Sequence, residues 1–146
     1  MVGMAENSTT RTVAVWDQVG LDGAVAAGWR VISLCGNRRY RLPAGKERVF
    51  HAFDAAHVVA NTARLVLHDR SRAFAANSVV QAHDSSGVMA TGSTKVYATD
   101  FALVAAHDRT EILLSGKAYA YRVRAPEVVI LRLPFRPAGL HQEVAA

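Results

Sequence analysis

The feature that most constrains this chain is a period of eight residues in its central part. Counted in steps of eight, one position of every copy is Val or Ile, and the position two residues later is Ala or Leu. The first set is Val80, Val88, Val96, Val104 and Ile112, and the second is Ala82, Ala90, Ala98, Ala106 and Leu114. The fifth position of the copies holds Asp84, Gly92, Asp100, Asp108 and Gly116. A fixed period indicates one structural unit that repeats.

The period predicts a short strand followed by a tight corner in each copy. Eight is an even number, so the first and third positions of every copy point to the same face of a strand. Asp and Gly at the fifth position tolerate the backbone of a tight turn, and the seventh position is always small. Because equal positions would stack on one another, we expect an all-β fold, a short parallel β-solenoid of about nine or ten copies. The alternative is a β-sandwich or barrel with short strands at similar spacing.

The number of copies in one coil is left open by the spacing. Two or three copies could form a coil. His83 and His107 are three copies apart, so a three-sided coil would stack them.

The chain is expected to form a single domain over residues 1–146, because this length can bury a core without disulfides. We divide it into an N-terminal cap region (1–48), a repeat region (49–125) and a C-terminal closing segment (126–146). In the cap region we expect strands at 11–16 and 28–35, and a helical turn from Asp17 through Ala27. The apolar residues are mainly Ala and Val, which predicts a thin core. The lone Cys35 is expected to be a small buried residue and not a nucleophile.

The start of the chain is polar and has no apolar signal-peptide segment, and no stretch is long enough to span a bilayer. We therefore expect a cytoplasmic protein with no membrane partner, with a virion or another particle as the alternative location.

Two runs of the repeat resemble a known family. The run with Val80, Ala82 and Asp84, and the run with Val96, Ala98 and Asp100, are similar to the tandem octapeptides Ala-Thr-Val-x-Ala-Tyr-(Asp or Gly)-Ser of bacterial and phage-associated proteins. The resemblance covers residues 49–125 and departs from the pattern near residues 57 and 78 and at Phe101, Leu113 and Leu114. It implies a β-solenoid, and it carries no common activity.

Three His-Asp pairs are candidates for metal chemistry, because imidazole and carboxylate groups bind transition metals. The residues that a metal could use are His68, His83, Asp84, His107 and Asp108. The alternative is that each Asp is the corner residue and each His fills an exposed position. Since no HExxH, CxxC or HxH motif accompanies the pairs, we expect no metal and no cofactor.

Two surfaces are candidates for binding. The basic patch contains Arg38, Arg39, Arg41, Lys46 and Arg48, with Tyr40 inside it, and could contact nucleic acid or cap the end of the solenoid. The outward apolar residues Met89, Tyr97, Phe101, Leu103 and Leu113 are the interface candidates.

No catalytic motif is visible, so we expect no catalytic residues and lean against an enzyme. Our first hypothesis is a non-enzymatic structural or interaction protein that assembles through a solenoid face, as a homo-oligomer or with a partner protein, and is phage- or particle-associated. The alternatives are a carbohydrate-active or metal-dependent β enzyme that uses the His-Asp pairs, and a nucleic-acid-binding module.

Overall fold

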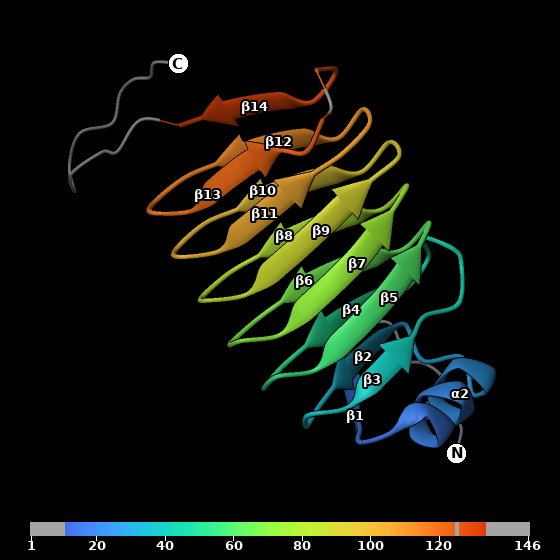
Figure 1. Cartoon of the computed structure of the whole chain (residues 1–146). Helices are drawn as coiled ribbons and strands as arrows, with labels where there is room; N and C mark the ends of the chain where they lie inside the picture. Colours follow the sequence, from blue (N-terminus) through green and yellow to red (C-terminus); the bar gives the residue numbers. More distant parts are fainter. Residues whose placement is uncertain (1–10, 125, 134–146) are drawn as a thin grey trace.

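The computed structural model describes residues 11–124 and 126–133, and it confirms the predicted parallel β-solenoid. All strand pairs are parallel, and the chain winds through about eight turns (Figure 1). The alternative of a sandwich or barrel is therefore wrong. The polar start of the chain at residues 1–10 and most of the closing segment lie outside the described residues.

The strands form two parallel sheets, and the chain alternates between them. The eight-stranded sheet contains β1 (Thr12–Val15), β2 (Val31–Leu34), β4 (Val49–Ala52), β6 (Arg64–Leu67), β8 (Val79–Ala82), β10 (Lys95–Ala98), β12 (Glu111–Leu114) and β14 (Val129–Arg132). The six-stranded sheet contains β3 (Arg39–Arg41), β5 (His57–Asn61), β7 (Arg72–Ala76), β9 (Gly87–Thr91), β11 (Leu103–Ala106) and β13 (Tyr119–Arg122). One coil therefore holds two strands, and a three-sided coil is ruled out.

The core is a thin layer between the two sheets. In the eight-stranded sheet Val80 pairs with Val96, which pairs with Ile112, and in the six-stranded sheet Val88 pairs with Val104. All of these side chains are buried, as are the Ala and Leu residues two positions later. The first and third positions of these eight-residue copies thus point into the core, as the even period predicts.

The chain turns from the eight-stranded to the six-stranded sheet at an edge that we call the Asp edge, formed by Asp54, Asp69, Asp84 and Asp100. Their φ angles of 57°, 55°, 54° and 58° are left-handed, a conformation that Asp tolerates better than most residues. Each carboxylate from Asp69 onward accepts a hydrogen bond from the backbone N–H of the Asp one coil earlier, at 2.8–2.9 Å. The corners are therefore joined into a ladder along the edge. At the opposite edge Thr62, Asn77, Gly92 and Asp108 take the same backbone conformation.

The N-terminal end is closed by a helix. Asp17 caps α2 (Gln18–Ala26) by accepting the Gly20 N–H at 2.8 Å, as predicted. The helix lies where the first coil would otherwise add a strand beside β3 (Figure 1). The Gln18 side chain accepts the Arg41 N–H at 2.8 Å and donates to the Arg41 carbonyl at 3.1 Å. An amide side chain thus takes the place of a neighbouring strand and protects the sheet edge.

The two sheets extend across residue 48, where the predicted cap region ends. In the eight-stranded sheet β2 pairs with both β1 and β4, and in the six-stranded sheet β3 pairs with β5. The first coils of the solenoid are therefore built from residues that carry no visible repeat. Within the described ranges, no helix has the length and apolar character needed to cross a membrane.

Candidate interaction faces

The outer side of the six-stranded sheet, which we call the six-stranded face, presents two long columns of side chains and a short third column of Asn61, Ala76 and Thr91. The register gives one long column as Arg39, His57, Arg72, Gly87, Leu103 and Tyr119, and the other as Arg41, Val59, Phe74, Met89, Ala105 and Tyr121. The residues near α2 include three arginines, Arg39, Arg41 and Arg72, and the residues nearer the C-terminal end are mostly aromatic or aliphatic. Neither long column contains an Asp or a Glu.

A shallow groove of about 460 Å³ runs over this face. Its floor includes Gly87 and Ala105, and Phe74, Met89 and Leu103 lie around them. Although the Ala105 side chain points outward, only 7% of Ala105 is exposed, because its larger neighbours shield it. Small residues in two adjacent strands thus leave a hollow between large apolar side chains.

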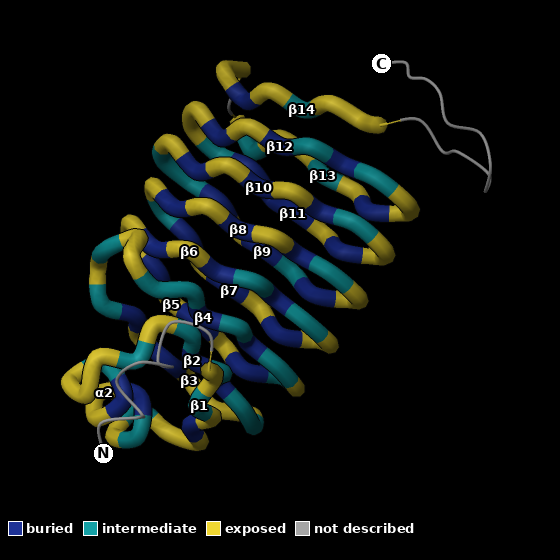
Figure 2. Tube along the Cα trace, turned by 180° about the vertical axis from the view of Figure 1, so that it is seen from behind, coloured by how far each residue is buried: buried dark blue, intermediate teal, exposed yellow. Residues whose placement is uncertain are grey.

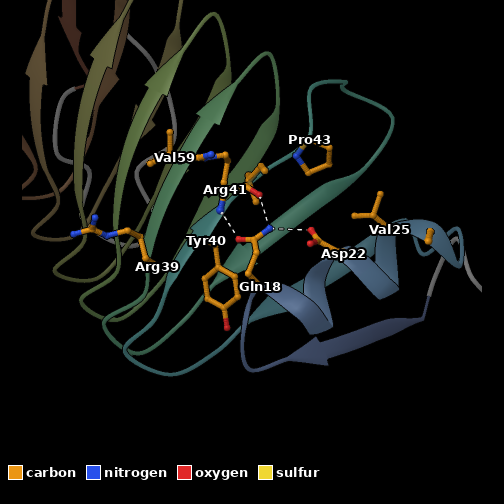
Figure 3. Close-up of a pocket in the computed structure, with 10 residues that line it drawn as sticks. Gln18, Asp22, Val25, Arg39, Tyr40, Arg41, Pro43 and Val59 are labelled. Carbon is orange, nitrogen blue, oxygen red and sulfur yellow. Dashed lines mark hydrogen bonds between the residues drawn. The ribbon is translucent and has the colours of Figure 1, made fainter.

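A second hollow of about 730 Å³ lies between α2 and β3. Figure 3 shows Gln18 between Asp22 and the backbone of Arg41, with Arg39 and Val59 beside it on the sheet. Gln18 Nε2 also donates to Asp22 Oδ1 at 2.9 Å. Because Arg39 and Val59 line both hollows, the six-stranded face continues to the helix.

The predicted basic patch is divided by the fold. Arg39 and Arg41 lie on β3 and are exposed on the six-stranded face. Arg48 lies before β4 and forms an ion pair with Glu47 at 3.2 Å, the one ion pair among the residues that the structure describes. Arg38 and Lys46 are exposed in the loops on either side of β3. The structure adds Arg72 to the arginines of this face, and His57 lies between Arg39 and Arg72 in the register.

Tyr40 does not belong to the basic surface. It is completely buried, and its hydroxyl donates to the carbonyl oxygen of Cys35 at 2.7 Å and lies 3.2 Å from that of Val15. Its ring cannot stack on a ligand, because it fills the core beneath α2. Cys35 itself is half-buried, and burial together with the nearby Asp54 carboxylate raises the pKa of its thiol.

The outer side of the eight-stranded sheet, the eight-stranded face, is mixed in character. Toward the C-terminal end one column reads Val79, Lys95, Glu111 and Val129, and the other reads Gln81, Tyr97, Leu113 and Leu131. Exposed residues follow these strands in Figure 2. The face thus combines apolar side chains with charges of both signs.

The five interface candidates do not form one patch. Met89 and Leu103 lie on the six-stranded face, whereas Tyr97 and Leu113 lie on the eight-stranded face. Phe101 is at a corner of the Asp edge, where Lys117 Nζ lies 5.6 Å from its ring centroid. Successive copies alternate between sheets, so equal positions in the repeat point to opposite sides of the molecule.

The candidate metal residues fall into two groups: His68, His83 and Asp84 lie at the Asp edge, and His107 and Asp108 lie at the opposite edge. His83 follows β8 at the Asp edge, and His107 follows β11 at the opposite edge. Asp84 already accepts the Asp69 N–H at 2.8 Å. Asp108 accepts hydrogen bonds from the Thr91 hydroxyl and the Gly92 N–H, which lower the pKa of its carboxyl group. The described residues contain no group of three or more His, Cys, Asp or Glu side chains that could hold a metal.

Beside the Asp edge, two of these candidates, His68 and His83, form a cluster with His51 and Phe53, which the sequence did not suggest. His51 Nδ1 lies 3.0 Å from His68 Nε2, and Phe53 stacks on His68 with ring centroids 4.5 Å apart. His83 follows one coil later, with its ring centroid 5.7 Å from that of His68. Burial lowers the pKa of His51, and His68 and His83 lower it further. Burial and His83 also lower the pKa of His68, while Asp84 and Asp69 oppose this shift.

The residues that sequence reasoning missed on the six-stranded face are His57, Arg72, Phe74, Tyr119 and Tyr121. They occupy the outward positions of alternate copies, so they form columns only when two copies make one coil. Comparison of outward residues that lie two copies apart in the sequence would have revealed these columns. Comparison of the chain with models of protein families, with curated proteins and with solved structures finds no match.

Proposed function

We propose that this chain is a non-enzymatic interaction protein that forms a homodimer through its eight-stranded face. The observation that carries the proposal is the pairing of Lys95 with Glu111 in adjacent strands, beside the pair Tyr97 and Leu113. Across β10 and β12 a positive charge is paired with a negative charge, and an apolar residue with an apolar residue. A second copy of the same face can therefore complement the first.

A two-fold axis parallel to the strands and midway between β10 and β12 gives this complementarity. Rotation about that axis places β10 of one copy opposite β12 of the other. Because Lys95 and Glu111 are at the same height in the sheet, each would face the other residue in the second copy. Tyr97 would face Leu113, and Val79 would face Val129 in the same way.

The size of the contact predicts a weak dimer. Four strands of this sheet cover roughly 14 by 13 Å, from the usual strand spacing and rise per residue. This is well below the ~800 Å² that each partner buries in a standard interface. We therefore expect a weak dimer that is populated only at high protein concentration.

A non-enzymatic role is supported by the way in which the polar residues are used. The carboxylates of the Asp edge accept backbone hydrogen bonds at the corners, and His83 and His107 lie at opposite edges. Association with a phage or another particle remains a prediction from the sequence.

Charge exchange at the two residues tests the proposal by sedimentation equilibrium over a range of concentrations. Lys95→Glu places two carboxylates opposite each other across the axis, and Glu111→Lys places two ammonium groups there. We expect each to weaken self-association roughly tenfold, and the double exchange to restore it. Lys46→Glu, an exposed change in the loop before β4, is the matched control. A wild-type chain that stays monomeric at the highest concentration refutes the proposal, as does a double exchange that restores nothing.

A further inference from the structure

The end of the six-stranded face nearest α2 carries an excess of positive charge. Arg39, His57 and Arg72 are register neighbours, so they follow one another on adjacent strands about 4.8 Å apart. Arg41 lies beside Arg39 on the same strand. None of these arginines forms an ion pair in the part of the chain that the structure describes. Asp22 of α2 lines the hollow beside Arg39 and Arg41, but the three arginines outnumber it, and such a group of like charges attracts an anion with repeated charges.

From β7 toward β13 the six-stranded face carries exposed rings and a hollow. Phe74 is 55% exposed, Tyr119 59% and Tyr121 44%. The rings of Tyr119 and Tyr121 are 6.4 Å apart and tilted by 31°, so neither covers the face of the other. Together with the groove over Gly87, they offer flat apolar surface to a planar group.

The remaining side chains narrow the class of ligand. The two long columns contain no Ser, Thr, Asn, Gln, Asp or Glu, the residues that usually bond sugar hydroxyls; such side chains occur only in the short third column, as Asn61 and Thr91. What the face provides is guanidinium groups, which suit phosphates, and rings on which bases can stack. Both groups occur together in a nucleic acid strand.

We propose that the six-stranded face binds single-stranded nucleic acid, with phosphates on Arg39, Arg41 and Arg72 and bases on Phe74 and the rings toward β13. The strand would run along the columns, across the β-strands. This site lies on the opposite side of the molecule from the proposed dimer contact, so binding does not depend on self-association.

The shape of the face favours a single strand over a duplex. The face is an open sheet, whereas readout of a duplex requires an element that enters a groove. From β3 to β13 the columns extend over about 24 Å. An extended single strand of about four nucleotides covers this length, which lies at the lower end of known site sizes.

Fluorescence anisotropy measures binding of a labelled oligothymidylate of about twelve nucleotides. We expect binding at low salt, and a slope of log K against log[salt] of about −2 from three phosphate contacts on a single strand. A duplex of the same length should bind at least several-fold more weakly.

The variants separate charge from stacking. Arg72→Ala should weaken binding and reduce the salt slope by about 0.7. Phe74→Ala should weaken binding roughly 5- to 150-fold without changing the slope. Gly87→Glu should abolish binding, because it fills the groove with a negative charge. A Cβ at Gly87 meets only atoms 3.9 Å away, so the backbone can accept the change.

Gly23→Glu is the matched control, since a Cβ there meets nothing within 4 Å and Gly23 lies on the exposed side of α2. This variant should bind like the wild type, and so should Lys95→Glu. Thermal melts establish that each variant is folded.

Several results would overturn the proposal. One is the absence of binding by the wild type at low salt. A second is equal loss in Gly23→Glu and Gly87→Glu. A third is a Phe74→Ala variant that binds like the wild type, which would mean attraction of any polyanion. The last is displacement of the oligonucleotide at lower concentration by heparin or by phosphatidylserine-containing vesicles, which would point to an acidic polysaccharide or a membrane.

Discussion

Replacement of Asp84 by Ala, Gly and Asn separates the two ways in which the Asp edge stabilises the solenoid. Asp84 has a φ angle of 54°, and its Oδ2 accepts the Asp69 N–H at 2.8 Å. Ala removes the acceptor and leaves a side chain that disfavours this backbone. Gly removes the acceptor but accepts the backbone, and Asn keeps both the conformation and an acceptor oxygen.

The expected magnitudes follow from these losses. The ladder hydrogen bond is exposed, so its loss costs about 1 kcal/mol. A positive φ costs Ala about 1 kcal/mol more than Gly. We therefore expect the free energy of unfolding to fall by about 2 kcal/mol in Asp84→Ala, about 1 in Asp84→Gly, and below about 0.5 in Asp84→Asn. For a chain of this size, 1 kcal/mol lowers Tm by about 3 °C.

Thermal and urea unfolding measure these differences, and hydrogen exchange locates them. Exchange of the Asp69 amide should become faster in the Ala and Gly variants and remain slow in the Asn variant. Ser85→Ala, a change at the next residue of the same turn, is the control. Equal stability of the Ala and Gly variants would refute the backbone contribution. An Asn variant as unstable as the Ala variant would show that the charge, and not the geometry, is what matters.

Three further predictions concern the interior and the edges. Thr94 is completely buried, and its hydroxyl both accepts a backbone N–H and donates to backbone carbonyls, so Thr94→Val should lower the free energy of unfolding by about 1–3 kcal/mol in urea melts. Since the folded-state pKa values of His51 and His68 lie below the ordinary 6.5, the unfolded chain binds more protons below about pH 6.5. The free energy of unfolding should then be smaller at pH 5 than at pH 7.5, and this difference should be smaller in His51→Leu than in the wild type. In an NMR titration, Thr91→Val should raise the pKa of Asp108, because its hydroxyl bond is the main cause of the lowered value.

Much of the fold could be predicted because the repeat acts through local rules. Side chains alternate along a strand, so an even period predicts which residues are inside, and burial of Val80 and Ala82 agrees. Asp at the corner tolerates a positive φ, and this is what Asp84 adopts. The helix cap at Asp17 is equally local.

The candidate site could be predicted only in part, because a surface depends on which copies are neighbours. Met89 and Tyr97 occupy equal positions of adjacent copies, yet they point to opposite faces. The basic patch was expected to include Tyr40, whose hydrophobic ring is buried in the core. Phe74 and Tyr121 are far apart in sequence and come onto one face through pairing of every second strand.

The period of eight is enough to decide that this chain forms short strands, which side chains face inward and where the corners lie, because each of these depends on residues close in sequence. It is compatible with coils of two or three strands, since both preserve the parity. The strand pairing shows the choice: β8 pairs with β10 and β9 pairs with β11, so every second strand lies in the same sheet. Because this pairing joins strands that are not adjacent in sequence, local rules do not fix it. That choice placed His83 and His107 at opposite edges, and it collected the arginines and rings of the six-stranded face.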